Sequence, residues 1–375
     1  MRSVTEATRK HEFSHYDAVS QLDEQALRAL LKDGRPSEKV WAAWHLALVA
    51  GAGADPALTD AITDEPTAGV RAHWVIVLFS HQEHDLVAVL AQYDPSALVR
   101  ETAARYLAPI AHRSTLGVTL AACLTDRSSR VRQTTVRHLS PAPGEGLLSR
   151  VFSMVEDGDP QVRMAALEYI LAHHSGALKE VRAYASDPDV HVRRRAIDAL
   201  ADSESTETDW ALDRLLVETD EAARDRLTSR LLEAGRDAEM AQGLAEGAPL
   251  AIHDVFAPLA RAERRFPWAV MAPLFGSCPD SPTLLVLCAC LDTETIPEGS
   301  AVALIDEATA YYEGEELWLP HLIQITRPLL DSLAPERRAG FPALRALLAD
   351  ELVAARAQRW GPIDTLESLL AMLPE

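Results

Sequence analysis

The chain has 375 residues, enough for two or three globular domains or for one array of stacked repeats. Ala and Leu are abundant and aromatic residues make up only 6%, so we expect an all-α fold with almost no β-structure. The formal net charge of −20 argues against nonspecific attraction to nucleic acid or to anionic membrane surfaces.

Residues 1–22 form a polar leader that we expect to be disordered or partly helical. The leader lacks the apolar region of a secretory signal, and the apolar runs of the chain are shorter than the roughly 18 to 20 residues of a membrane-spanning helix. Four cysteines in a chain of this length predict free thiols and not a disulfide framework. The sequence therefore predicts a cytoplasmic protein that binds no membrane.

A zinc-binding pattern occurs inside the leader, where His11, Glu12 and His15 match the HExxH motif of metallopeptidases. Two His residues one helical turn apart can bind zinc while the Glu activates water. The segment has no preceding strand and no third ligand at a suitable spacing, so we interpret the match as coincidental. We predict no metal and no cofactor.

A pattern of Asp, often followed by Pro or Ser, and then Val-Arg recurs every 29 to 32 residues between residues 23 and 235. The Asp suits a turn before a helix, and the residues 4 and 8 positions after the Val lie with it on one helical face. We expect this face to form a seam between repeats of two helices each, because one helix pair alone cannot bury it. The Val position of the seven units is occupied by Val40, Val70, Val99, Val131, Val162, Val192 and Ala223.

Three tryptophans lie in the first two units. Trp44 and Trp74 both stand 4 positions after the Val, so we predict that they fill space in the seam. Trp41 stands where the other units have Arg, and we expect it to be an exposed contact.

The repeated segments resemble the HEAT-repeat family, and in particular the short bacterial repeats of the phycobilisome-lyase type. The resemblance implies a right-handed α-α superhelical solenoid of antiparallel helix pairs, with a ladder of Asp–Arg ion pairs between successive repeats. In the second unit Asp64 is one residue out of step. The implied ladder residues are Asp94, Arg100, Asp126, Arg132, Asp157, Arg163, Asp187 and Arg193, with Arg71 and Arg224 in the same register.

The Val-Arg register is lost after residue 235. Residues 236–375 still contain helical segments, separated by turns rich in Pro and Gly such as 279–282 and 297–299. We interpret this part as degenerate helical repeats or a helical cap that continues the solenoid.

Solenoids of this kind bind partners along the concave surface lined by their second helices. We expect residues 3, 6 and 7 positions after the Val to face it, where several aromatic and cationic side chains recur. Residues 92–200 contain 14 Lys plus Arg and 12 Asp plus Glu, whereas the remainder is strongly acidic. These positions can also be ordinary solvated ones, since Glu168 and Asp198 interrupt the series. The candidate partner-binding residues are His73, Arg105, Tyr106, Arg137, His138, Tyr169, Arg195 and Arg226.

The chain has no phosphate-binding loop, nucleophile elbow or paired-cysteine zinc pattern, so nothing positive supports catalysis. HEAT-type folds include AlkD-like DNA glycosylases and bilin lyases, and a nucleic-acid binder or enzyme of the first kind and a subunit of the second kind stay open as alternatives. Deoxyhypusine hydroxylases use several His-Glu dipeptides, whereas this chain has only His11-Glu12. The favoured hypothesis is a noncatalytic scaffold that binds an acidic or phosphorylated protein or peptide partner on its concave face.

Overall fold

The computed structural model describes residues 19–50, 56–112, 114–174, 176–203, 208–248, 251–278, 280–313, 319–358 and 362–374. These residues form helices joined by short turns and contain no strand; the one extended pairing among them is an isolated bridge between Phe266 and Leu291. The predicted all-α fold is therefore confirmed. The HExxH segment at His11 to His15 lies outside the described residues.

The chain divides into two compact units, residues 1–196 and 197–375, which we describe separately. The division falls inside helix α13 (Val190–Ala201).

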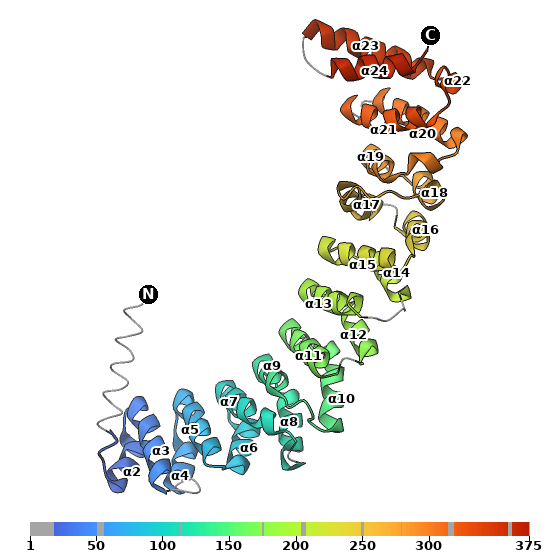
Figure 1. The fold of residues 1–375 in the computed structure, drawn as a ribbon. Helices are drawn as coiled ribbons and strands as arrows, with labels where there is room; N and C mark the ends of the chain where they lie inside the picture. Colours follow the sequence, from blue (N-terminus) through green and yellow to red (C-terminus); the bar gives the residue numbers. More distant parts are fainter. Residues whose placement is uncertain are drawn as a thin grey trace. The chain divides into compact units, whose positions relative to one another are not determined.

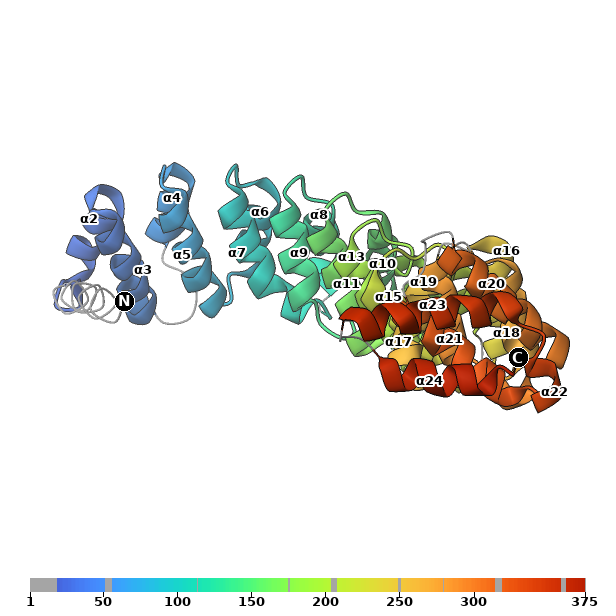
Figure 2. The same cartoon turned by 90° about the horizontal axis from the view of Figure 1, so that it is seen from above.

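Unit 1 is built from helix pairs. Figure 1 shows that its first helices form one layer and its second helices the other, and Figure 2 shows successive pairs side by side from α2 and α3 to α8 and α9. We call the exposed surface of the second helices of unit 1 the second-helix face. The pairs are α2 (Glu24–Asp33) with α3 (Pro36–Ala50), α4 (Pro56–Asp64) with α5 (Ala68–Ser80), α6 (His84–Tyr93) with α7 (Ala97–Leu107), α8 (Gly117–Leu124) with α9 (Ser129–His138), α10 (Glu145–Ser153) with α11 (Pro160–His173), and α12 (Leu178–Tyr184) with the start of α13.

The predicted seam forms the core of unit 1, because the second helices α3, α5, α7, α9 and α11 each pack on the next. Trp74 is fully buried, and its indole N–H donates to the carbonyl of Lys39 at 3.1 Å. The seam is incomplete at the first repeat, where Leu48 is 66% exposed and Trp44 is only half-buried. Leu48, 8 positions after Val40, therefore does not fill the seam, and Trp44 fills it only in part. The buried seam residues include Val70, Leu78, Val99, Ala103, Leu107, Val131, Thr135, Leu139, Val162, Ala166 and Ile170.

The repeated aspartates stabilise the turns before the second helices. Asp94 accepts a hydrogen bond from the backbone N–H of Ser96 at 2.8 Å, and Asp126 accepts one from Ser128 at 2.8 Å. Ser96 and Ser128 are themselves the N-cap residues, so the aspartate holds the turn and does not cap the helix directly.

Unit 2 continues as helix pairs although the Val-Arg register ends at residue 235. Its second helices α15, α17, α19 and α21 pack successively on one another, as the seam helices of unit 1 do. The helices are α14 (Asp209–Leu215), α15 (Glu221–Glu233), α16 (Asp237–Gly247), α17 (Ile252–Arg261), α18 (Trp268–Gly276), α19 (Ser281–Cys290), α20 (Glu298–Glu313), α21 (Leu319–Ser332), α22 (Pro335–Arg338), α23 (Pro342–Gln358) and α24 (Ile363–Met372).

Candidate functional site

The Arg residues that follow the seam valines form a ladder of ion pairs inside unit 1. Each guanidinium group makes two hydrogen bonds to the carboxylate of the following repeat, and its third nitrogen donates to the backbone carbonyl before its own helix. In the Arg163–Asp187 pair the two N–O distances are 2.6 and 2.7 Å, and the third nitrogen donates to the carbonyl of Asp157 at 2.8 Å. The other pairs of this kind are Arg71–Asp94, Arg100–Asp126 and Arg132–Asp157.

The first rung of the ladder uses different residues. Lys39 donates to Glu65 at 2.6 Å, and Glu65 also accepts from the backbone N–H of Thr67 at 2.8 Å. Glu65 is buried whereas Asp64 is exposed, so the acid at this place is Glu65 and not its out-of-step neighbour. Glu65 stands six residues before Arg71, as Asp94 stands six residues before Arg100.

The last two ladder arginines, Arg193 and Arg224, also make contacts within the chain. Arg193 donates to the carbonyl of Asp187 at 2.6 Å in unit 1. In unit 2, Arg224 pairs with Asp254 at 2.9 Å. The ladder arginines are therefore occupied by structural contacts and offer little to a partner.

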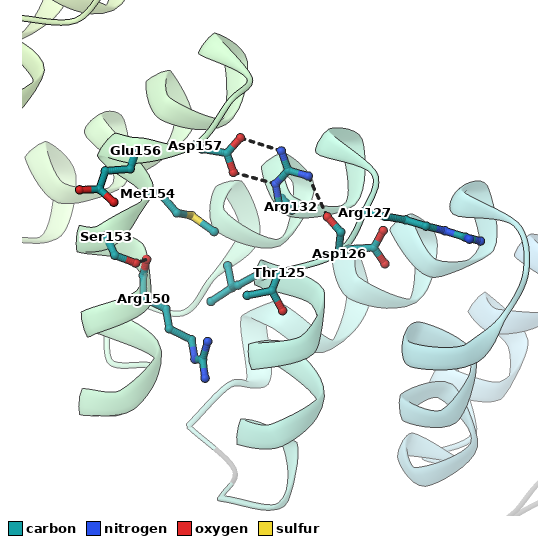
Figure 3. Close-up of a pocket in the computed structure, with 10 residues that line it drawn as sticks. Thr125, Asp126, Arg127, Arg132, Arg150, Ser153, Met154, Glu156 and Asp157 are labelled. Atoms are coloured by element: carbon teal, nitrogen blue, oxygen red, sulfur yellow. Dashed lines mark hydrogen bonds and ion pairs between the residues drawn. The ribbon is translucent and has the colours of Figure 1, made fainter.

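A pocket of about 450 Å³ lies beside the Arg132–Asp157 rung (Figure 3). Figure 3 shows Arg132 held between Asp157 and the backbone of Asp126. Asp126, Glu156 and Asp157 all line the pocket with Arg150, so cationic and acidic groups are mixed there. This mixture does not favour the binding of a simple anion.

Asp126, which pairs with Arg100 in the ladder, makes the stability of the fold depend on pH. Burial opposes ionisation of this carboxyl, but hydrogen bonds from Arg100 and Ser128 outweigh it and lower the pKa of Asp126 below its usual value. A carboxyl group with a lowered folded-state pKa stabilises the fold above its unfolded pKa of about 4, and this contribution is lost as the pH falls through the folded-state pKa.

We therefore expect the gap in unfolding free energy between the natural chain and Asp126→Asn to be large at neutral pH and to shrink near pH 3. Chemical denaturation across this pH range measures it. A gap that stays constant with pH would show that the ionised carboxylate of Asp126 does not stabilise the fold.

The predicted partner-binding residues divide into exposed and occupied ones. Arg105, Arg137, His138 and Arg195 are exposed in unit 1, as is His73. Arg105 lies 3.6 Å from Glu101, while Arg137 and Arg195 make no hydrogen bond or ion pair with the part of the chain that the structure describes.

The two histidines are held by their own helices. His73 bonds through Nδ1 to the carbonyl of Gly69 at 2.8 Å, and His138 bonds in the same way to Thr134 at 3.0 Å. These contacts fix the side-chain direction of both rings on the second-helix face.

Tyr169 is buried and Arg226 is half-buried in an ion pair, which corrects the prediction that both are open to a partner. Tyr169 is only 5% exposed, its hydroxyl donates to the carbonyl of Ser140 at 2.7 Å, and burial raises the pKa of Tyr169 to about 12. Arg226 lies in unit 2, where it pairs with Asp202. Tyr106 is half-buried and its ring lies 5.3 Å from that of Phe79, so it offers only part of its surface.

A second pocket, also of about 450 Å³, lies between α3 and α5. Trp41 and Trp44 line it together with His73 and Gly69. The repeat pattern predicts that Trp44 fills the seam, and it does not single out Gly69. The signal that could have found the pocket is the lack of a side chain at residue 69, where the next second helices have Leu98 and Arg130.

Burial shields the cysteine thiols, and the described metal-ligating side chains do not cluster. All four cysteines are free, and burial raises the pKa of Cys123 to about 12 and that of Cys278 to about 11, which disfavours the reactive thiolate. Within the described ranges no group of three or more His, Cys, Asp or Glu residues could hold a metal ion. None of the helices described is both long enough and apolar enough to span a bilayer.

A comparison with protein families agrees with the helix pairs. Residues 148–232 match a family model described as HEAT repeats. The X-ray structure of YibA from Escherichia coli is similar at 17% sequence identity, covering 74% of this chain and 96% of that one, with a TM-score of 0.38. No curated protein matches the chain. The predicted HEAT repeats are confirmed for residues 148–232.

Proposed function

We propose that the chain is a noncatalytic scaffold whose second-helix face binds an acidic or phosphorylated segment of a protein partner. HEAT repeats typically mediate protein interactions, which supports the scaffold role. The observation that carries the proposal is that Arg137 and Arg195 are exposed and uncompensated within the described chain, although its net charge is −20. A guanidinium group offers paired donors that match a carboxylate or a phosphate.

The spacing of the helices predicts the spacing of the partner's acidic groups. Neighbouring packed helices lie about 8–10 Å apart, and an extended peptide advances about 3.3 Å per residue. Arg105 and Arg137 occupy the same position on neighbouring second helices, so they suit acidic residues about three positions apart. Arg195 lies on α13, two second helices beyond α9. An acidic residue that meets Arg195 should therefore lie about six positions beyond the one that meets Arg137.

Two acidic residues interrupt the row of exposed arginines on the second-helix face. Glu168 occupies on α11 the position of Arg137 on α9, and Glu101 lies beside Arg105 and Arg130 on the same face. A duplex needs a continuous row of phosphate contacts, so this interrupted surface favours a short acidic segment over DNA. The four free thiols fit a reducing compartment such as the cytoplasm.

Selection of a random 12-residue peptide library on the immobilised chain tests the proposal. We expect enrichment of peptides with two or more Asp or Glu residues at the spacings above, and affinity that falls as salt is raised, because exposed charge pairs are screened. Selected peptides without acidic enrichment would overturn it. Tighter, salt-dependent binding of a DNA duplex would instead favour the nucleic-acid alternative.

A further inference from the structure

The pocket between α3 and α5 has a wall of two indole rings. Trp41 and Trp44 stand on α3, and Val70 and His73 stand on α5 opposite them. His73 is the one residue with a titratable side chain among those that line it. A volume of about 450 Å³ falls within the range of small-ligand and side-chain pockets. The pocket is therefore suited to an uncharged group.

Gly69 lines this pocket and adds no side chain to it. It is the second residue of α5, and a Cβ atom added there would meet no atom within 4 Å. The same position carries Leu98 on α7 and Arg130 on α9. Trp44 is half-buried at a position where Trp74 in the next repeat is fully buried. Trp44 and Gly69 therefore both line an open space between α3 and α5.

The pocket belongs to the same face as the exposed arginines. It lies between α3 and α5, and Arg105 stands on the next second helix, α7. At about 8–10 Å per helix the pocket is about 12–15 Å from Arg105, which an extended peptide spans with about four residues.

We propose that this pocket holds an aromatic anchor residue, Trp or Tyr, of the same acidic segment that binds Arg105, Arg137 and Arg195. This inference rests on the proposed function. Nδ1 of His73 is directed to the carbonyl of Gly69, so Nε2 is the nitrogen available to accept from an indole N–H or a phenol O–H. A charged side chain would find no opposite charge among the residues that line the pocket. The anchor residue therefore sets the register of the partner segment, and the acidic residues that follow lie along the second-helix face.

Two labelled synthetic peptides test the anchor. Both peptides have three Glu residues, with the second three positions after the first and the third six positions after the second. One peptide has Trp four positions before the first Glu, and its counterpart has Ser at that position. Each is made in both chain directions. We expect the natural chain to bind the better Trp peptide about ten-fold more tightly than its Ser counterpart, as for a buried aromatic anchor. Fluorescence polarisation measures both affinities.

Gly69→Leu is the decisive variant, because Leu favours the helix and adds a side chain at the pocket, where its Cβ atom meets open space. We expect the Gly69→Leu variant to bind both peptides with the affinity that the natural chain has for the Ser peptide. Gly299→Leu is the matched control: Gly299 is the second residue of α20, in unit 2, and an added Cβ atom meets nothing there either. It should keep the ten-fold preference, and circular dichroism should show that both variants fold.

The outcomes separate the two proposals. Equal binding of the Trp and Ser peptides by the natural chain, or a ten-fold preference that survives Gly69→Leu, overturns the anchor and leaves the acidic-segment proposal standing. Binding of the Ser peptide that is unaffected by Arg137→Glu with Arg195→Glu overturns the proposed function, and the anchor inference with it.

Discussion

Replacing Asp187 by Ala is expected to lower the free energy of unfolding of unit 1 by about 3 kcal/mol. The Asp187 side chain is 1% exposed and Arg163 is 8% exposed, so the substitution leaves a buried guanidinium group without its carboxylate. It also removes the acceptor of the Asp189 backbone N–H, 2.8 Å away. Urea denaturation followed by circular dichroism measures the loss. Hydrogen exchange locates it in α11 and α12, because repeat arrays can unfold in parts.

Glu168→Ala is the matched control, since it removes an exposed carboxylate from α11 that has no ion pair among the described residues. Its effect should stay within about 0.5 kcal/mol. If Asp187→Ala is as mild as Glu168→Ala, the ladder does not hold the repeats together. Replacing Arg163 by Met together with Asp187 by Leu distinguishes the two causes of the loss. Partial recovery in this double variant would assign most of it to the unpaired charge and not to the ion pair itself.

The sequence predicted the seam and most of the ladder because both depend on spacing along a helix. Val99, Ala103 and Leu107 lie on one face at intervals of four, and all three are fully buried. The acid six residues before each Arg is equally regular. Counting six residues back from Arg71 and Arg224 would have found the buried acids Glu65 and Glu218, which a search for Asp alone misses.

The sequence could not predict features that depend on contacts between repeats. Tyr169 occupies a position that is exposed at His138, yet the carbonyl of Ser140, 29 residues earlier, accepts from its hydroxyl, and the rings of His173 and His174 pack on it. The periodicity of α11 contains no information about that loop.

The pocket at Trp44 also depends on residues of two neighbouring repeats. Gly69 on the facing helix lines it without a side chain, so the residues of α3 alone do not predict it. A periodic pattern predicts which face of a helix is apolar, but the side chains of the neighbouring repeat decide whether that face is covered.

Replacing Arg137 and Arg195 together by Glu is expected to weaken binding of the acidic peptide about 100-fold. Each guanidinium–carboxylate contact contributes about 1.5 kcal/mol, and 1.4 kcal/mol corresponds to a factor of ten in affinity. Both side chains are exposed, so the unfolding free energy should change by less than about 0.5 kcal/mol for each substitution. Fluorescence polarisation with a selected peptide measures the affinity, and denaturation of the same samples measures the stability.

A control with the same change in net charge separates local contacts from the field of the whole chain. Arg150 on α10 and Arg264 after α17 are both exposed, and neither makes a side-chain ion pair within the described ranges. Arg150→Glu with Arg264→Glu adds the same negative charge at residues that do not belong to the second-helix face. Long-range repulsion weakens peptide binding in both double variants, whereas direct contacts weaken it only in Arg137→Glu with Arg195→Glu. At high salt the repulsion shared by both variants is screened, so the difference between them reports the contacts at Arg137 and Arg195.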